Sequence, residues 1–143
     1  MIVRGYREQD FIDIKLKPTT DITVEQLAKL AVGAAHCFSC FTFEQNGRPV
    51  AIVGAHRMWD GVAQVWSIVS DEVRGHGLEL TKTIKDLLKI VFDTHGIRRG
   101  NILVDSSIRE NIRWAELLGF KYEFTMEKAS PQGKDILGYV YWA

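Results

Sequence analysis

A strand-to-helix junction occupies residues 65–80, V-W-S-I-V-S-D-E-V-R-G-H-G-L-E-L. The apolar run at its start is typical of a buried strand. Two acidic residues and the pair Gly75 and Gly77 then interrupt the pattern, and the apolar period changes from two to about 3.6 residues. The new apolar face is formed by Leu80, Ile84, Leu87, Leu88 and Val91. The junction therefore predicts a strand over residues 62–70 and a long helix that ends at residues 95–96.

Three strand-like runs, residues 39–45, 48–59 and 62–70, are joined by Asn46-Gly47 and Asp60-Gly61. Both dipeptides are strong signals of tight hairpin turns. We therefore expect an antiparallel meander immediately upstream of the long helix.

The N-terminal part of the chain predicts one strand and two helices. Residues 2–4 have the pattern of a strand, and residues 7–15 that of a short helix or helical turn. Residues 23–26, T-V-E-Q, form a capping-box pattern, which is typical of a helix start. Apolar positions continue at helical spacing to about Ala35, so an amphipathic helix is expected there.

The C-terminal part predicts a short buried strand at residues 101–104, a helix at 110–118 and a closing hairpin of residues 120–127 and 136–142. The full order is β-α-α-β-β-β-α-β-α-β-β. This order indicates a mixed α/β (α+β) fold with four helices and a twisted, mostly antiparallel sheet. A parallel strand pair is expected where the long helix connects two strands. The length of 143 residues fits a single domain over residues 1–143.

Composition narrows the class of protein. Lys+Arg and Asp+Glu both number 18, and no basic block occurs, which argues against a nucleic-acid partner. The N-terminus MIVRGYREQD lacks the apolar core of a signal peptide, and no apolar stretch is long enough to cross a bilayer. We therefore expect a cytoplasmic protein without a membrane partner.

The two cysteines, Cys37 and Cys40, are spaced C-F-S-C. A redox pair or half of a zinc site has this spacing, but the four histidines offer no matching paired ligands. A redox pair would open a helix, whereas a strand-like run follows here. Plain, partly buried thiols are the favoured interpretation, and no metal site is predicted.

Two stretches resemble the GNAT superfamily of acyltransferases. The superfamily carries R/Q-x-x-G-x-G/A between its fourth strand and the long helix, where this chain has Arg74 and Gly77 at the first and fourth positions. The second stretch, residues 111–120, N-I-R-W-A-E-L-L-G-F, is similar to the superfamily's helix ending in leucine-glycine-phenylalanine. The resemblance covers nearly the whole chain and implies a GNAT-like fold that uses acetyl-CoA as co-substrate.

Within the superfamily, the chain looks most like the small GNAT-like proteins of short-tailed phages, including an internal virion protein. The similar stretches are G-R-P-V-A-I-V-G, W-S-I-V-S-D-E-V and the helix just quoted. A phage protein located in the host cytoplasm or the virion is therefore implied, with a phage or host protein as a further partner.

The resemblance implies a cofactor cleft along the fourth strand and the following turn. Its predicted residues are Trp66, Ile68, Val69, Arg74, Gly75, His76, Gly77 and Leu78. Backbone N–H groups at a helix start bind phosphate, and glycines let the backbone approach it closely. A tight strand-to-helix turn without a ligand would also use these glycines. Trp66 and Ile68 would be core residues in either case.

Acyl transfer also needs proton acceptors and donors. Asp71 and Glu72 are the predicted water-relayed base, with His56 and Asp60 as alternatives, although such residues often only solubilise a loop. By position, the superfamily's tyrosine acid falls on Ala115, which has no proton to give.

Two further positions depart from the superfamily: its asparagine falls on Ile108, and Glu79 stands where a glycine or alanine belongs. Tyr122 or Ser106 could replace the missing acid. Two hypotheses therefore stay open, an N-acetyltransferase acting on an amine of a small molecule or protein, and a catalytically silent GNAT-fold binding module. The acceptor amine is not indicated, and a homodimer could form through the aromatic end of the closing hairpin.

Overall fold

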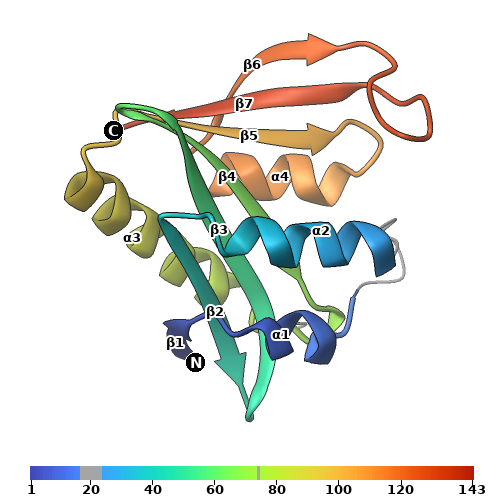
Figure 1. Ribbon diagram of the computed structural model, residues 1–143. Coiled ribbons are helices and arrows are strands. Elements are labelled where there is room, and N and C mark those ends of the chain that lie inside the picture. The colour runs from blue at the N-terminus through green and yellow to red at the C-terminus, as the bar shows by residue number, and fades with distance from the viewer. Residues whose placement is uncertain (17–23, 74) are drawn as a thin grey trace. The chain divides into compact units, whose positions relative to one another are not determined.

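The computed structural model describes residues 1–16, 24–73 and 75–143 (Figure 1). The helices and strands are, in chain order, β1 (Ile2–Gly5), α1 (Glu8–Asp13), α2 (Val24–Ala34), β2 (Ser39–Gln45), β3 (Arg48–Trp59), β4 (Val62–Val69), the short 3-10 helix η1 (Asp71–Val73), α3 (Gly77–His95), β5 (Arg99–Asp105), α4 (Arg109–Leu117), β6 (Lys121–Met126) and β7 (Ile136–Trp142). This order is the predicted one. The capping box expected at residues 23–26 begins at Thr23, which lies outside the described residues.

The strands form a mostly antiparallel sheet in the order β1-β2-β3-β4-β5-β7-β6. The predicted mixed fold with four α-helices is therefore confirmed for the described chain. The start of β4 pairs in parallel with β5, with Val62 opposite Arg99, as the connection through a long helix requires. The closing hairpin of β6 and β7 is also confirmed, but it is β7 that pairs with β5.

The chain divides into two compact units. The first comprises residues Met1–His56 and Trp66–Leu80, and the second comprises Arg57–Val65 and Thr81–Ala143. Because β3, β4 and α3 each pass from one unit to the other, the units are assembled from discontinuous stretches of sequence.

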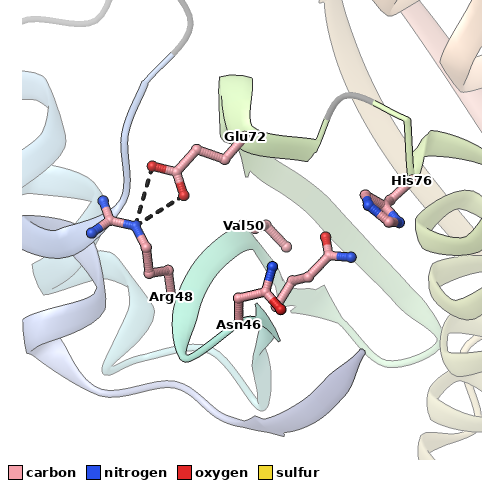
Figure 2. Close-up of a pocket in the computed structure, with 6 residues that line it drawn as sticks. Asn46, Arg48, Val50, Glu72 and His76 are labelled. Carbon is pink, nitrogen blue, oxygen red and sulfur yellow. Dashed lines mark hydrogen bonds and ion pairs between the residues drawn. The ribbon is translucent and has the colours of Figure 1, made fainter.

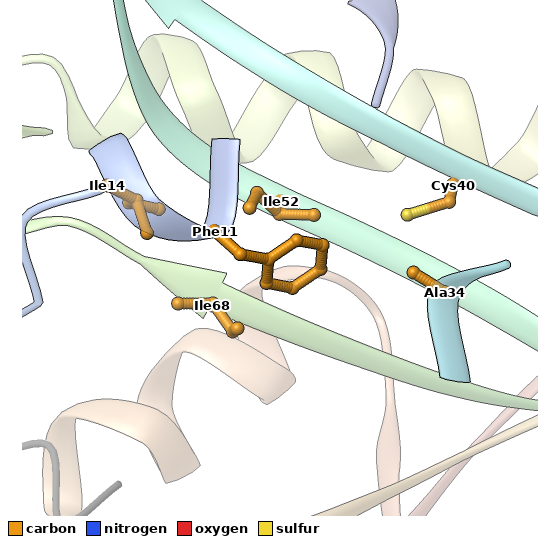
Figure 3. Packing of buried hydrophobic residues seen from close by; sticks show 6 residues of the cluster. All are labelled: Phe11, Ile14, Ala34, Cys40, Ile52 and Ile68. Carbon is orange, nitrogen blue, oxygen red and sulfur yellow. The ribbon is translucent and has the colours of Figure 1, made fainter. Parts of the chain in front are cut away.

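The core of the first unit joins its helices to its strands. Figure 3 shows Phe11 of α1 lying by Ile52 of β3 and Ile68 of β4. Ile14, which follows α1, Ala34 of α2 and Cys40 of β2 complete this buried cluster. The short helix α1 is therefore held by the burial of an aromatic side chain, because six residues are too few for a stable isolated helix.

A close approach of two strands shapes the same core. A Cβ atom added to Gly54 of β3 would lie 2.3 Å from the ring of Trp66 on β4. Only glycine leaves room for the indole at this position. Trp66 is thereby packed against the core cluster, as the sequence predicted for it.

A buried polar network ties β1, α1 and β2 together. The guanidinium of Arg4 donates to both carboxylate oxygens of Asp10, at 2.8 and 2.7 Å. The Thr42 hydroxyl and the Arg7 backbone N–H also donate to Asp10, at 2.7 and 2.8 Å. Burial alone would raise the pKa of Asp10, but these hydrogen bonds outweigh it, and the pKa falls to about 2.

The core of the second unit is built on β5, β7 and the helices beside them. The ring of Phe92 lies where a Cβ of Gly100 would be, at 2.5 Å, so this glycine lets α3 pack closely on β5. Tyr141 of β7 contacts the rings of Phe92 and Phe120, each with centroids 5.7 Å apart. Tyr139 is buried, so it does not belong to the exposed aromatic surface expected at this hairpin, whereas Trp142 is exposed.

One prediction for the second unit needs adjustment. The predicted buried strand at residues 101–104 is longer, and Leu103 on it is half exposed. The strand β6 forms an edge of the sheet, and all of its residues are exposed. Among the described helices, none combines the length and the apolar character needed to traverse a bilayer.

Candidate functional site

The connection from β4 to α3 and the first residues of α3 contain four of the predicted cofactor-binding residues, Gly75, His76, Gly77 and Leu78. The strand ends at Val69, and η1 follows directly. The His76 N–H then donates to the Val73 carbonyl at 2.9 Å, and the His76 carbonyl accepts from the Leu80 N–H at 3.0 Å. His76 therefore closes the turn and also opens the helix.

The surface of this turn is open at its glycines. Gly75 has a φ of +82°, which favours glycine, and Gly75, His76, Gly77 and Leu78 are all exposed. A Cβ added at Gly75 or Gly77 would meet no atom within 4 Å. A ligand can therefore approach the backbone at the start of α3, where helix geometry favours an anion. The predicted Arg74 lies outside the described residues.

Two of the three predicted residues of β4 have side chains in or against the core cluster. Ile68 is buried in the core cluster, and Trp66 packs against the same cluster. Val69 is partly buried at the end of the strand. The side chains of Trp66 and Ile68 therefore serve the core, as expected. Any contact that they make with a ligand would have to come from their backbone.

The predicted base residues Asp71 and Glu72 both lie in η1, partly buried. The backbone N–H of Asp71 donates to the Lys15 carbonyl at 3.2 Å, and that of Glu72 donates to Ser70 Oγ at 3.1 Å. The Glu72 carboxylate accepts two hydrogen bonds from Arg48 Nε, at 3.2 and 2.9 Å (Figure 2). Glu72 is therefore engaged by the first residue of β3.

A shallow pocket lies beside this ion pair. Its lining residues are Gln45, Asn46, Arg48, Val50, Glu72 and His76 (Figure 2). Its empty volume is about 400 Å³, part of which is open solvent. The pocket joins the β2–β3 hairpin to the predicted cofactor turn through His76.

The sequence did not predict that four residues of the hairpin line a pocket. These residues are Gln45, Asn46, Arg48 and Val50. Asn46-Gly47 did locate the hairpin, because both residues adopt positive φ, at +53° and +74°. The hairpin lies beside the connection between β4 and α3 because β3 is next to β4 in the sheet. The Ser70 N–H also donates to the Val50 carbonyl, at 2.8 Å.

Glu79 lies exposed in the first turn of α3. Its carboxylate is 3.6 Å from the amino group of Met1. The negative charge that departs from the superfamily's pattern therefore lies near a positive group in the same unit.

The other departures lie in the second unit. Ala115 is buried in α4, and Ile108 precedes α4 without a side-chain hydrogen bond to cap it. Tyr122, a predicted replacement acid, is exposed, with its hydroxyl 2.7 Å from Thr125 Oγ1. His56 and Asp60, the alternative bases, are exposed on and beside β3.

The cysteines are free thiols. Burial raises the pKa of Cys40 to about 12 and also raises the pKa of Cys37. Protonated thiols are poor nucleophiles and poor metal ligands. In the part of the chain that the structure describes, no group of three or more His, Cys, Asp or Glu residues is arranged to hold a metal ion.

Comparison with known proteins identifies the fold. No protein-family model and no curated protein sequence matches the chain. An acetyltransferase of the GNAT family from Bacillus anthracis is similar in structure, with a TM-score of 0.73 and 15% identity over 98% of this chain and 93% of that one. A ribosomal-protein-alanine N-acetyltransferase from Brucella melitensis has a TM-score of 0.74 at 13% identity, with both chains fully covered.

A mutant spermidine N-acetyltransferase from Vibrio cholerae has a TM-score of 0.73 at 14% identity, over 99% of this chain and 95% of that one. At such identities the comparisons establish the GNAT fold over almost the entire chain.

Proposed function

We propose that this chain is an N-acetyltransferase that transfers the acetyl group of acetyl-CoA to an amine, within one domain over residues 1–143. The observation that carries the proposal is the exposed stretch of Gly75, His76, Gly77 and Leu78, which follows β4 and η1 and opens α3. Its glycines leave space for a phosphate to reach the backbone, which fits the pyrophosphate of CoA. The GNAT fold of the chain supports the same assignment.

In this proposal, the backbone of β4 between Trp66 and Val69 pairs with the pantetheine arm in the manner of an added strand. Acetyl-CoA supplies an activated acetyl thioester. The amine nitrogen attacks the thioester carbon, and a backbone N–H near Ile68 or Val69 donates to the oxyanion that forms. The carbon–sulfur bond then breaks, and the released thiolate takes a proton.

Asp71 and Glu72 are the proposed acceptors of the amine proton, through a bridging water. The carboxylate of Glu72 already accepts from Arg48. Its role as a base therefore requires water to reach an unused lone pair or Arg48 to move away.

The acceptor is proposed to be an amine of a small molecule or of a protein. Two similar structures are, by name, acetyltransferases of spermidine and of a ribosomal-protein alanine. The resemblance of three sequence stretches to phage proteins supports a phage-encoded protein that acts in the cytoplasm of the host.

Thermal unfolding with and without acetyl-CoA tests the proposal. At about a hundred times its dissociation constant the ligand adds roughly 2.7 kcal/mol of stability, a rise in Tm of roughly 8 °C for a chain of this length. Calorimetric titration gives the affinity, and thiol release with a panel of amines gives turnover. Absence of both the shift and the titration heat at millimolar acetyl-CoA contradicts the proposal.

Gly77→Asp is the matched variant for this test. The dipole of a helix attracts a negative charge in its first turn, which stabilises the helix. The variant is therefore expected to fold as well as the wild type. The same charge repels a pyrophosphate. Acetyl-CoA should therefore stabilise the wild type and leave the variant almost unchanged.

A second candidate function is a catalytically silent GNAT-fold module that binds a virion or host protein. The observation that favours it is the buried methyl group of Ala115, which stands where the superfamily's tyrosine acid belongs and has no proton to donate. Acetyl-CoA binding without thiol release for any amine would favour this candidate over the enzyme.

A further inference from the structure

The Arg48–Glu72 ion pair forms part of the lining of the pocket beside the proposed cofactor turn. Asn46 and Gly47 make the tight hairpin turn, so Arg48 is fixed as the first residue of β3. It binds Glu72 through Nε alone, which donates to both carboxylate oxygens. Within the described residues, the terminal nitrogens Nη1 and Nη2 of Arg48 have no hydrogen-bond partner.

This ion pair is easily exchanged. The side chain of Arg48 is 57% exposed and that of Glu72 is 29% exposed, so water and salt screen their attraction. Exposed pairs of this kind contribute little to stability. A ligand anion that offers Arg48 two oxygens can therefore replace the carboxylate at small cost.

The remaining pocket residues suit an anion. The amides of Gln45 and Asn46 and the ring of His76 can each donate a hydrogen bond, and Glu72 is the one acid in the lining. Arg48 neutralises that acid while the ion pair is formed. When Arg48 turns to a ligand anion, the charge of Glu72 stays in the lining and opposes binding, so removal of this charge should favour the anion. His76 also belongs to the turn that the proposed pyrophosphate occupies, so the pocket and the turn are continuous.

We propose that Arg48 binds a phosphate group at the nucleotide end of CoA, and that it leaves Glu72 to do so. The guanidinium fork matches two phosphate oxygens better than the single-nitrogen contact matches Glu72. The exchange frees Glu72, the proposed base, when the co-substrate arrives. This inference rests on the proposed function and adds a binding residue outside the turn between β4 and α3.

Calorimetric titration of CoA and of 3′-dephospho-CoA into the wild type, Arg48→Gln and Glu72→Gln tests the inference. Arg48→Gln should weaken CoA binding about tenfold, because a charged hydrogen bond to phosphate is lost. Glu72→Gln should tighten CoA binding about threefold, because the competitor for Arg48 is removed. A pair that acted only as a structural link between hairpin and turn would make both variants bind more weakly.

The two ligands identify the phosphate. If Arg48→Gln weakens the binding of CoA but not that of 3′-dephospho-CoA, Arg48 binds the 3′-phosphate. If it weakens the binding of both ligands equally, Arg48 binds the pyrophosphate. Unchanged affinity of Arg48→Gln for both ligands, or weaker binding by Glu72→Gln, overturns the inference while the proposed function stands. A wild type that binds neither ligand overturns both. Unfolding temperatures of the variants within about 2 °C of the wild type show that folding is intact.

Discussion

Two ion pairs of the first unit have the same chemistry and opposite surroundings. Arg4 and Asp10 are 20% and 4% exposed, and Asp10 accepts from four donors in three parts of the chain. Arg48 and Glu72 are 57% and 29% exposed and meet through one nitrogen. The first pair is enclosed by protein, and the second lies at a surface turn.

The difference separates a structural pair from an exchangeable one. Removing a partner from a buried pair leaves a charge without solvent, which is costly. Removing a partner from an exposed pair leaves a charge that water solvates. The exchange proposed for Arg48 is possible only in the second case. This difference supports the proposed site at the turn and a structural role for the network of β1, α1 and β2.

The largest expected effect is that of Asp10→Asn. The amide cannot accept from both Arg4 nitrogens as a carboxylate does. Among the described residues, Glu44 is the acidic partner that remains for the Arg4 charge. We expect the free energy of unfolding to fall by about 3 kcal/mol, measured by urea titration. Glu72→Gln is the control, with an expected loss of less than about 0.5 kcal/mol. Equal losses would remove the distinction between the two pairs.

The hydrogen bonds of Asp10 should also make the stability of the protein depend on pH. The pKa of Asp10 in the folded state is about 2, below its ordinary value of 3.8, so the unfolded state binds the proton more readily. The contribution of Asp10 is therefore complete above about pH 5 and is lost as the pH falls towards 2, for a total of about 2.5 kcal/mol.

Urea titrations at several pH values compare the wild type with Asp10→Asn. The stability difference between the two proteins should shrink by about this amount on acidification. A constant difference would show that Asp10 has an ordinary pKa in the folded protein.

The smallest changes in stability are expected for alanine substitutions at two glycines. Gly54→Ala would place a Cβ 2.3 Å from the Trp66 ring, and we expect it to cost about 2 kcal/mol of stability. Gly77→Ala meets no atom within 4 Å at the start of α3, and it should change stability by less than about 1 kcal/mol. The same Gly77→Ala should weaken acetyl-CoA binding, because a methyl group would stand where a phosphate approaches. Unaltered binding would argue that this glycine serves only the turn.

Most elements of the fold were predictable from the sequence. Asn46-Gly47 and Asp60-Gly61 located both hairpins, and the change in period past Gly77 located α3. Local sequence patterns sufficed to locate these elements. Turn residues reflect the backbone conformation, and the apolar period reflects the burial of one face of a helix or strand. The insertion of β7 between β5 and β6 was not predictable, because either strand of a hairpin can pair with a third.

The candidate site was predicted only in part. The turn residues were found because glycines between a strand and a helix carry a local signal. Arg48 carried no signal, because an arginine after a hairpin turn usually faces solvent. The role proposed for Arg48 depends on its contact with Glu72, which is 24 residues away in sequence.

By itself, the sequence determined the order of the helices and strands, the GNAT-like junction at residues 65–80 and the changed positions Glu79, Ile108 and Ala115. These features depend on residue identity and short spacing. The tertiary structure alone decided that Asp10 is buried among four donors and that Arg48 engages Glu72. Thr42 is 32 residues from Asp10, and Glu72 is 24 residues from Arg48. Sheet pairing and burial, which no local pattern contains, decide which of these contacts form.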